Sequence, residues 1–164
     1  VTGSNGKSTT SALTVHLLLA ALGRTRAVLQ GGNDRSRQVP LASLQQADEE
    51  DILLWEVSNR HLRDRSVPVD IAILTNITRN HIEDHGSWEA YVEAKLRLPR
   101  AALQAGGHAI LCAGDPVSRE SLPELRTLPG TLWTVGASDS GVPSEGAAWI
   151  GDDDRLLVLL ADEH

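Results

Sequence analysis

The sequence has no methionine among its 164 residues and a single cysteine, Cys112. Without a methionine, position 1 is no initiator, and we expect the chain to be a piece of a longer polypeptide. One cysteine excludes an internal disulfide and a zinc cluster built from cysteines. The longest apolar runs, 17–22 and 156–161, are far too short to span a bilayer. We therefore expect no signal peptide, no membrane segment and a cytoplasmic protein.

Basic residues are in the minority as well. The sequence has 15 Lys and Arg against 22 Asp and Glu, which gives a formal net charge of −7. This balance disfavours a general nucleic-acid binder and a protein of anionic membrane surfaces. The apolar share of 41% and the charged share of 23% are ordinary for a globular domain, and the length fits one.

The stretch 1–10, Val-Thr-Gly-Ser-Asn-Gly-Lys-Ser-Thr-Thr, is typical of a nucleotide phosphate loop that opens onto a helix. Glycines permit a tight turn whose N–H groups face phosphate oxygens, and Lys7 adds a cation. The stretch departs from the general pattern G-x-x-x-x-G-K-[ST], because Val1 stands where the first glycine is expected. The alternative is a glycine-rich turn before a capped helix. The residues predicted to bind phosphate are Gly3, Ser4, Asn5, Gly6, Lys7, Ser8 and Thr9, with Ser8 also placed to hold magnesium.

Apolar periodicity alternates between strands and helices along the chain, which predicts an α/β fold with a mostly parallel sheet flanked by helices. We expect strands at 26–30, 52–55, 71–74, 109–112 and 131–135, and helices at 8–22, 41–47, 87–105 and 115–125. Pro99 should kink or interrupt the third of these helices. After this core at 1–136, the segment 137–146 reads as a loop, and 147–164 reads as a small antiparallel hairpin.

Two buried strands deliver polar residues where they end, Glu56 after 52–55 and Asn76 after 71–74. Because ligands bind at the carboxyl ends of parallel strands, both side chains should share one rim with the phosphate loop. A carboxylate leaving a buried strand needs a cation, and magnesium beside the phosphates would serve; a solvated loop is the alternative. By themselves, His81 and Lys95 read as a surface histidine and a lysine that extends to solvent.

The order of these stretches carries more information than each alone. The phosphate loop, Gly31-Gly32-Asn33, Glu56-Val57-Ser58, the segment 75–87 and the segment 91–95 together resemble the central ATP-binding domain of the Mur ligases, which add amino acids in peptidoglycan synthesis. The pattern is most similar to the members that add D-glutamate to UDP-N-acetylmuramoyl-L-alanine. The pieces at 78–81 and 89–91 also suit the members that add the third residue.

The resemblance implies ATP and two Mg²⁺ ions as cofactors. Lys7 and the loop amides would hold the β- and γ-phosphates, and Asn33 would contact the phosphate end of the site. Ser8 and Glu56 would share one magnesium, and Glu56 with His81 would place the second. Lys95 matches a lysine that carbon dioxide carbamylates into an oxygen-donor anion. The catalytic residues expected by resemblance are Lys7, His81 and Lys95; the metal ligands are Ser8, Glu56, His81 and Lys95.

The implied reaction activates a carboxylate as an acyl phosphate, which the amine of an amino acid then attacks. The substrates, UDP-N-acetylmuramoyl-L-alanine and D-glutamate, would be bound through flanking domains, and the adenine-binding residues would follow His164. We therefore expect the piece to be incomplete at both ends and inactive alone.

Several residues depart from the family pattern. Asn80 and Glu83 stand where aspartates are usual, 34–37 replaces the usual Ile-Gly continuation, and Asn59-Arg60-His61 replaces Ser-Phe-Gln or similar. Two alternatives therefore stay open: a folylpolyglutamate-type or other relative with a different substrate, and a nucleotide-binding module that has lost catalysis.

Overall fold

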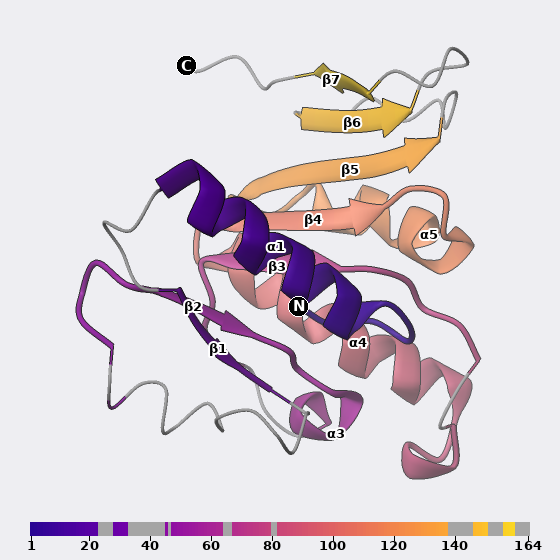
Figure 1. Ribbon diagram of the computed structural model, residues 1–164. Coiled ribbons are helices and arrows are strands. Elements are labelled where there is room, and N and C mark those ends of the chain that lie inside the picture. Colours follow the sequence, from indigo (N-terminus) through magenta and orange to yellow (C-terminus); the bar gives the residue numbers. More distant parts are fainter. Residues whose placement is uncertain are drawn as a thin grey trace.

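The computed structural model describes residues 1–22, 28–32, 45, 47–63, 67–79, 82–137, 146–150 and 156–159. Its strands are flanked by helices on both sides (Figure 1). Helix α1 (Lys7–Leu22) lies on one face, and α4 (Trp88–Gln104) and α5 (Pro116–Leu125) lie on the other. The α/β fold with mostly parallel strands is therefore confirmed. In the described ranges, no helix is long and apolar enough to cross a membrane.

The strands form two hydrogen-bonded groups. β1 (Val28–Gly31) and β2 (Ile52–Trp55) pair in parallel. The second group follows the order β3 (Ile71–Leu74), β4 (His108–Cys112), β5 (Thr131–Ala137), β6 (Gly146–Ile150) and β7 (Leu156–Leu159). Its pairs are parallel from β3 to β6, whereas β7 runs antiparallel to β6 at the edge.

Val1 and Thr2 join the two groups of strands. The N–H of Val57, just past β2, donates to the Val1 carbonyl at 2.8 Å, and the Thr2 N–H donates to the Ile73 carbonyl of β3 at 2.8 Å. Thr2 also forms a parallel bridge with Leu74. Both residues therefore lie between β2 and β3. The loop after Thr2 therefore leaves the middle of the sheet at its carboxyl edge.

Side-chain N-caps begin the two helices on the far face. The Ser87 side chain accepts from the Ala90 N–H ahead of α4, and the Asp115 side chain accepts from the Ser118 N–H ahead of α5. Of the two effects predicted for Pro99, a kink or an interruption of the helix, the interruption is wrong, because α4 runs through Pro99 unbroken. Pro99 is fully buried, so its packing offsets the backbone hydrogen bond that proline cannot make.

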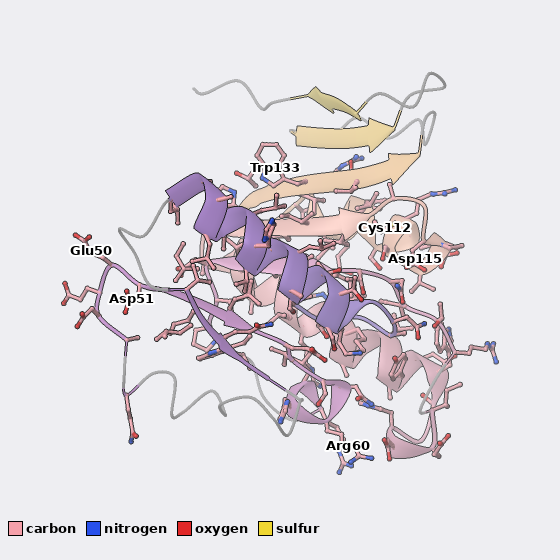
Figure 2. All side chains as sticks on the ribbon, in the orientation of Figure 1. Glu50, Asp51, Arg60, Cys112, Asp115 and Trp133 are labelled. Atoms are coloured by element: carbon pink, nitrogen blue, oxygen red, sulfur yellow. The ribbon has the colours of Figure 1, made fainter. Side chains whose placement is uncertain are left out.

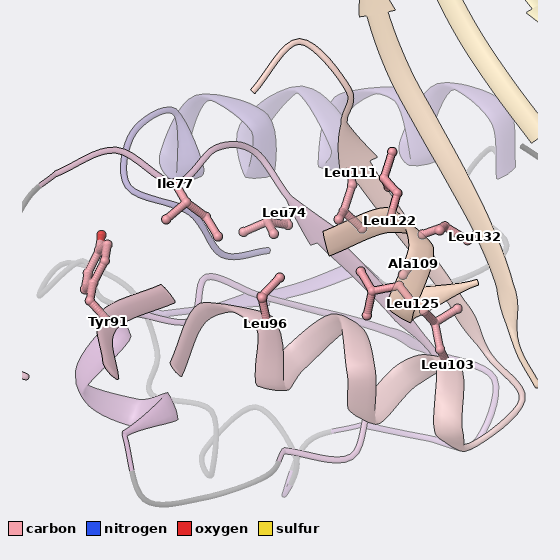
Figure 3. Packing of buried hydrophobic residues seen from close by; sticks show 10 residues of the cluster. All are labelled: Leu74, Ile77, Tyr91, Leu96, Leu103, Ala109, Leu111, Leu122, Leu125 and Leu132. Atoms are coloured by element: carbon pink, nitrogen blue, oxygen red, sulfur yellow. The ribbon is translucent and has the colours of Figure 1, made fainter. Parts of the chain in front are cut away.

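The main core lies between α4, α5 and strands β3 to β5 (Figure 3). Its buried members are Leu74, Ile77, Tyr91, Leu96, Leu103, Ala109, Leu111, Leu122, Leu125 and Leu132. A second cluster of Val57, Leu62, Ala72, Leu98 and Ala102 packs other residues of α4 against β3, the segment after β2 and the short helix α3 (Asn59–Leu62). These clusters fix α4, and with it Lys95, against the centre of the sheet.

Other predictions fall on residues outside the described part of the chain. They concern the start of the strand at 26–30, most of the helix at 41–47, most of the loop at 137–146 and the acidic turn between β6 and β7. The same holds for Asn33, Asn80 and His81.

Candidate functional site

The loop at 3–6 is held against the segment that follows β3. Gly3 has φ +144°, and a Cβ there would lie 1.9 Å from Thr75 Oγ1, so the close approach requires glycine. Thr75 Oγ1 donates to the Asn5 carbonyl at 2.6 Å. Ser4 N–H donates to the Asn76 carbonyl at 2.9 Å, and Thr78 N–H donates to Ser4 Oγ at 2.8 Å. The segment after β3 thus fixes the conformation of the loop through these hydrogen bonds.

Asn76 grips the middle of the loop with both ends of its side-chain amide. Its Oδ1 accepts from the Asn5 N–H at 3.0 Å, and its Nδ2 donates to the Asn5 carbonyl at 3.1 Å. The sequence placed Asn76 on the rim of the phosphate loop, and this contact confirms the placement. The backbone of Asn5 is consequently fixed before any ligand is present, which favours binding by a preformed loop.

Lys7 begins α1 and curls back over the loop. Its Nζ donates to the carbonyls of Gly3 (3.1 Å) and Ser4 (3.2 Å). An ammonium has three N–H donors, so these bonds leave one for an oxygen of a bound anion. The loop also leads directly into the positive end of α1, whose first turn contains the bond from Thr10 N–H to the Gly6 carbonyl at 2.8 Å.

Ser8 and Glu56 meet beside the loop. Ser8 Oγ donates to Glu56 Oε2 at 2.8 Å, and Glu56 is 6% exposed. Gly32, which follows β1, packs directly against Glu56, since a Cβ at Gly32 would lie 2.6 Å from Glu56 Cβ. The predicted neighbourhood of Ser8, Glu56 and the Gly31-Gly32 turn is therefore present, although Asn33 itself lies outside the described residues.

Lys95 reaches the loop from the opposite side of the sheet. It is 1% exposed, and its Nζ donates to the Gly3 carbonyl at 2.9 Å and to Thr2 Oγ1 at 3.4 Å. Burial, followed by the charge of Lys7, lowers the pKa of Lys95 to about 7. The prediction from the residue pattern alone, a lysine extending to solvent, is wrong, because α4 packs this face onto the sheet.

Tyr91 and Thr78 are site residues to which the sequence reasoning gave no role. The Tyr91 hydroxyl lies 2.8 Å from Ser4 Oγ, and the ring lies 5.6 Å from Lys95 Nζ. Asn5 Nδ2 donates to Thr78 Oγ1 at 3.1 Å. The spacing of Tyr91 and Lys95, four residues apart on one helix, was a usable signal, because such residues share a face and a buried tyrosine hydroxyl needs a partner.

Asp115, which follows β4 (Figure 2), steadies the same rim from behind. Its Oδ2 accepts from the Ile77 N–H at 3.2 Å and from Ser118 Oγ at 2.7 Å. The segment between Thr75 and Thr78 is therefore fixed on both sides, by the loop and by the start of α5.

The structure brings together most of the residues that the sequence proposed, namely Gly3, Ser4, Asn5, Lys7, Ser8, Glu56 and Lys95, through the bonds given above. Gly6 and Thr9 lie exposed at the turn into α1. His81 lies outside the described part of the chain, so its place in the site stays a prediction. Within the described part, no three His, Cys, Asp or Glu residues cluster into a metal site made by protein alone.

Comparison with known proteins decides the family. A family model described as the Mur ligase middle domain matches residues 1–150. The chain belongs to this family. The resemblance drawn from the motifs is thus confirmed.

Two curated relatives carry the name UDP-N-acetylmuramoylalanine--D-glutamate ligase. The protein from Zymomonas mobilis is 37% identical over 118 residues, which are 71% of this chain and 25% of that protein. The protein from Bordetella avium is 33% identical over 160 residues, which are 92% of this chain and 30% of that protein. The chain therefore spans less than a third of the length of these relatives.

Solved Mur ligases share the fold. The MurF ligase from Thermotoga maritima, solved in complex with ADP, superposes with a TM-score of 0.63 at 24% identity, covering 97% of this chain and 39% of that one. A UDP-N-acetylmuramoyl-L-alanyl-D-glutamate--2,6-diaminopimelate ligase gives a TM-score of 0.60 at 24% identity, covering 90% of this chain and 33% of that one.

Proposed function

We propose that this chain is the ATP-binding middle domain of a cytoplasmic ligase that adds D-glutamate to UDP-N-acetylmuramoyl-L-alanine. The observation that carries the proposal is the meeting of Lys7, the Ser8–Glu56 pair and buried Lys95 around one glycine loop. The names of the relatives supply the substrates. Flanking domains would bind the nucleotide sugar and the amino acid, so these 164 residues alone would not carry out the reaction.

In this proposal the loop and the start of α1 bind the phosphates of ATP. The preformed turn around Asn5 offers backbone N–H groups, α1 contributes its positive end, and Lys7 neutralises charge on the phosphate chain. The carboxylate of the substrate then attacks the γ-phosphate, and the amine of D-glutamate displaces phosphate from the acyl phosphate. The described residues contribute by positioning ATP and by stabilising negative charge that builds up during transfer.

Ser8 and Glu56 fit a magnesium ion held beside the phosphates. A hydroxyl and a carboxylate are oxygen donors, which magnesium prefers, and the phosphates and water would complete its shell. The buried Glu56 carboxylate also needs a positive partner, and Ser8 gives it one neutral hydrogen bond. A bound Mg²⁺ would supply charge neutralisation at the phosphates. A second ion, involving Glu56, His81 and modified Lys95, remains part of the proposal.

Burial of Lys95 supports its modification by carbon dioxide. Carbamylation requires the neutral amine, whose nitrogen attacks the carbon of CO₂ and then loses a proton to leave an N-carboxylate anion. Because the pKa of Lys95 is lowered to about 7, a large share of the amine is neutral near neutral pH. The product would place a negative group near the Gly3 carbonyl that Lys95 now contacts. It would also remove the repulsion between the charges of Lys95 and Lys7.

ADP formation by the polypeptide that contains this chain tests the proposal. With ATP, Mg²⁺, UDP-N-acetylmuramoyl-L-alanine and D-glutamate, we expect turnover that Lys7→Ala reduces by roughly two orders of magnitude or more. Turnover with a folate and L-glutamate instead would identify the folylpolyglutamate-type relative. Turnover with a later muramoyl peptide would identify another Mur-type ligase, and ATP binding without turnover would identify a module that has lost catalysis.

A further inference from the structure

A hollow of about 230 Å³ lies between α3 and the 3₁₀ turn η1 (Ile82–Asp84), lined by Arg60, Arg63, Asp84 and His85. Its lining includes Arg60, which belongs to the replacement Asn59-Arg60-His61, a departure from the usual family pattern that the proposed ATP site does not use. Arg60 lies at the outer end of α3, and its side chain extends away from the sheet (Figure 2).

Two guanidinium groups reach the same small region. Arg60 and Arg63 are three residues apart in helical backbone, which puts their side chains on one side. Arg60 Nε lies 3.4 Å from Asp84 Oδ2, and Arg63 Nη1 lies 3.5 Å from the Asp84 carbonyl. These contacts are long for charge-assisted hydrogen bonds, and the Arg60 side chain is 76% exposed. Such a pair can open for a stronger acceptor at little cost.

The backbone that carries the two arginines is fixed. Arg97 Nη1 donates to the Leu62 carbonyl at 3.0 Å and also to the Arg63 carbonyl, so α4 closes the end of α3. The region between α3 and η1 is tied by Asn59 Nδ2, which lies 3.0 Å from His85 Nε2. The backbone around the hollow is therefore held by α4 and by the Asn59–His85 contact.

His85 contributes an N–H donor, because its other ring nitrogen already accepts a hydrogen bond from Asn59. Because the Asn59 amide nitrogen donates to Nε2, the neutral imidazole carries its proton on Nδ1. Burial lowers the pKa of His85, and the charges of Arg63, Lys95 and Arg97 lower it further against the opposing effect of Asp84. With a neutral imidazole, the lining has two positive groups against one carboxylate, an excess of one positive charge.

We propose that this hollow is a subsite for an oxyanion, either a carboxylate or a phosphoryl group, bound by the forks of Arg60 and Arg63. Planar guanidinium groups match the oxygen pairs of both anions. A divalent cation is disfavoured, since a single carboxylate would face two arginines. The anion is either inorganic or a group on the substrate of the proposed ligase; the second source rests on the proposed function, whereas binding itself does not.

Titration of inorganic phosphate into the isotope-labelled chain, followed by NMR, tests the subsite. We expect saturable shifts of the His85 ring and the Arg60 side chain, separate from shifts of the Gly6 amide at the phosphate loop. Arg60→Gln and Arg63→Gln should each weaken the His85 response by roughly tenfold and leave the Gly6 response unchanged. Arg126→Gln, at an exposed arginine after α5, is the matched control and should change neither.

Two further variants make the outcome decisive. Asp84→Asn should tighten phosphate at His85, because it removes the competing carboxylate, while Arg60→Lys should bind with intermediate strength. A His85 ring that does not respond to phosphate, or weaker binding by Asp84→Asn, would overturn the proposal. To separate the sources, KM for UDP-N-acetylmuramoyl-L-alanine is measured in the larger polypeptide. A rise in that KM with Arg60→Gln, at constant KM for ATP, assigns the anion to the substrate; an unchanged KM assigns the subsite to an inorganic anion.

Discussion

Lys7 and Lys95, the two lysines of the sequence, donate hydrogen bonds to the same backbone carbonyl, that of Gly3. Their Nζ atoms lie 3.1 and 2.9 Å from its oxygen. Two ammonium groups on one oxygen repel each other, so the arrangement is more stable when one of them is neutral. The buried member is the one whose pKa is lowered to about 7. The pair thus consists of an amine suited to bind anions and an amine suited to react.

Reaction with carbon dioxide should therefore select one lysine. In ¹³C-bicarbonate near neutral pH, we expect a carbamate signal in the NMR spectrum of the wild-type chain. Lys95→Arg should abolish the signal, whereas Lys7→Arg should retain it. Because the sequence has two lysines, the pair of variants assigns a lysine carbamate to one of them, and acetylation of the Val1 amine, whose pKa is also lowered, removes the third amine that could react. A signal that survives Lys95→Arg would contradict the assignment.

The same burial makes stability depend on pH above neutrality. The amine of Lys95 loses its proton at about 7 in the folded chain but near its ordinary value of 10.5 in the unfolded chain. Between these values the unfolded state binds more protons, so the free energy of unfolding should rise with pH, by at most about 1.4 kcal/mol per pH unit. Urea denaturation from pH 7 to 10, without added bicarbonate, measures the slope.

Two substitutions check that slope. Lys95→Met should flatten it relative to the wild type. Lys7→Met should raise the pKa of Lys95 by removing the neighbouring charge. The rise in the free energy of unfolding should then begin at a higher pH than in the wild type. Equal slopes in the wild type and in Lys95→Met would count against a depressed pKa at this residue.

The two-sided contact between Asn76 and Asn5 should matter more for nucleotide binding than for folding. Asn76→Ala removes both hydrogen bonds, and we expect KM for ATP to rise roughly tenfold in the larger polypeptide. Asn76→Asp should be at least as damaging, because it turns a second oxygen toward the Asn5 carbonyl. Gln104→Ala, at an exposed amide on the last residue of α4, serves as the control. A rise in KM shared by the control would refute a specific role.

Gly32 should resist substitution because of Glu56. Its φ is +152°, and an added Cβ would lie 2.6 Å from Glu56 Cβ and 3.0 Å from the Glu56 carbonyl oxygen. Gly32→Ala should therefore cost about 1–3 kcal/mol of the free energy of unfolding. Gly106→Ala is the control for a positive φ without a close contact, since Gly106 has φ +80° with open space around it. Denaturant melts should show a larger loss for Gly32→Ala; equal losses would leave the contact with Glu56 without consequence.

The elements around the site were predictable where one rule decided them. Strands β2 and β3 are continuous apolar runs ending in polar residues, and their ends set the rim that holds Glu56 and Asn76. Contacts that depend on how two elements are positioned along each other in the fold could not be predicted. The partners of Asn5, 71 and 73 residues away at Asn76 and Thr78, are of this kind. Lys95 was misplaced by its residue type, because its burial depends on how α4 packs.

The meeting of Arg60, Arg63 and His85 was equally hidden in the sequence. Their neighbourhood depends on α3 lying next to η1, which follows a full strand later in the chain. The departure from Ser-Phe-Gln at 59–61 marked the position as unusual but did not give its partners. A motif thus located the phosphate loop, whereas the grouping of Arg60, Arg63 and His85 could be found only from the folded structure.

Because Val1 and Thr2 lie between β2 and β3, the loop that follows them is connected by hydrogen bonds to both groups of strands. A nucleotide clasped by residues 3–8 would be anchored to a segment that both halves of the sheet grip. Loading should then stiffen the molecule from its centre outward, and deuterium uptake should slow at the amides of β2 and β3 as well as at the rim.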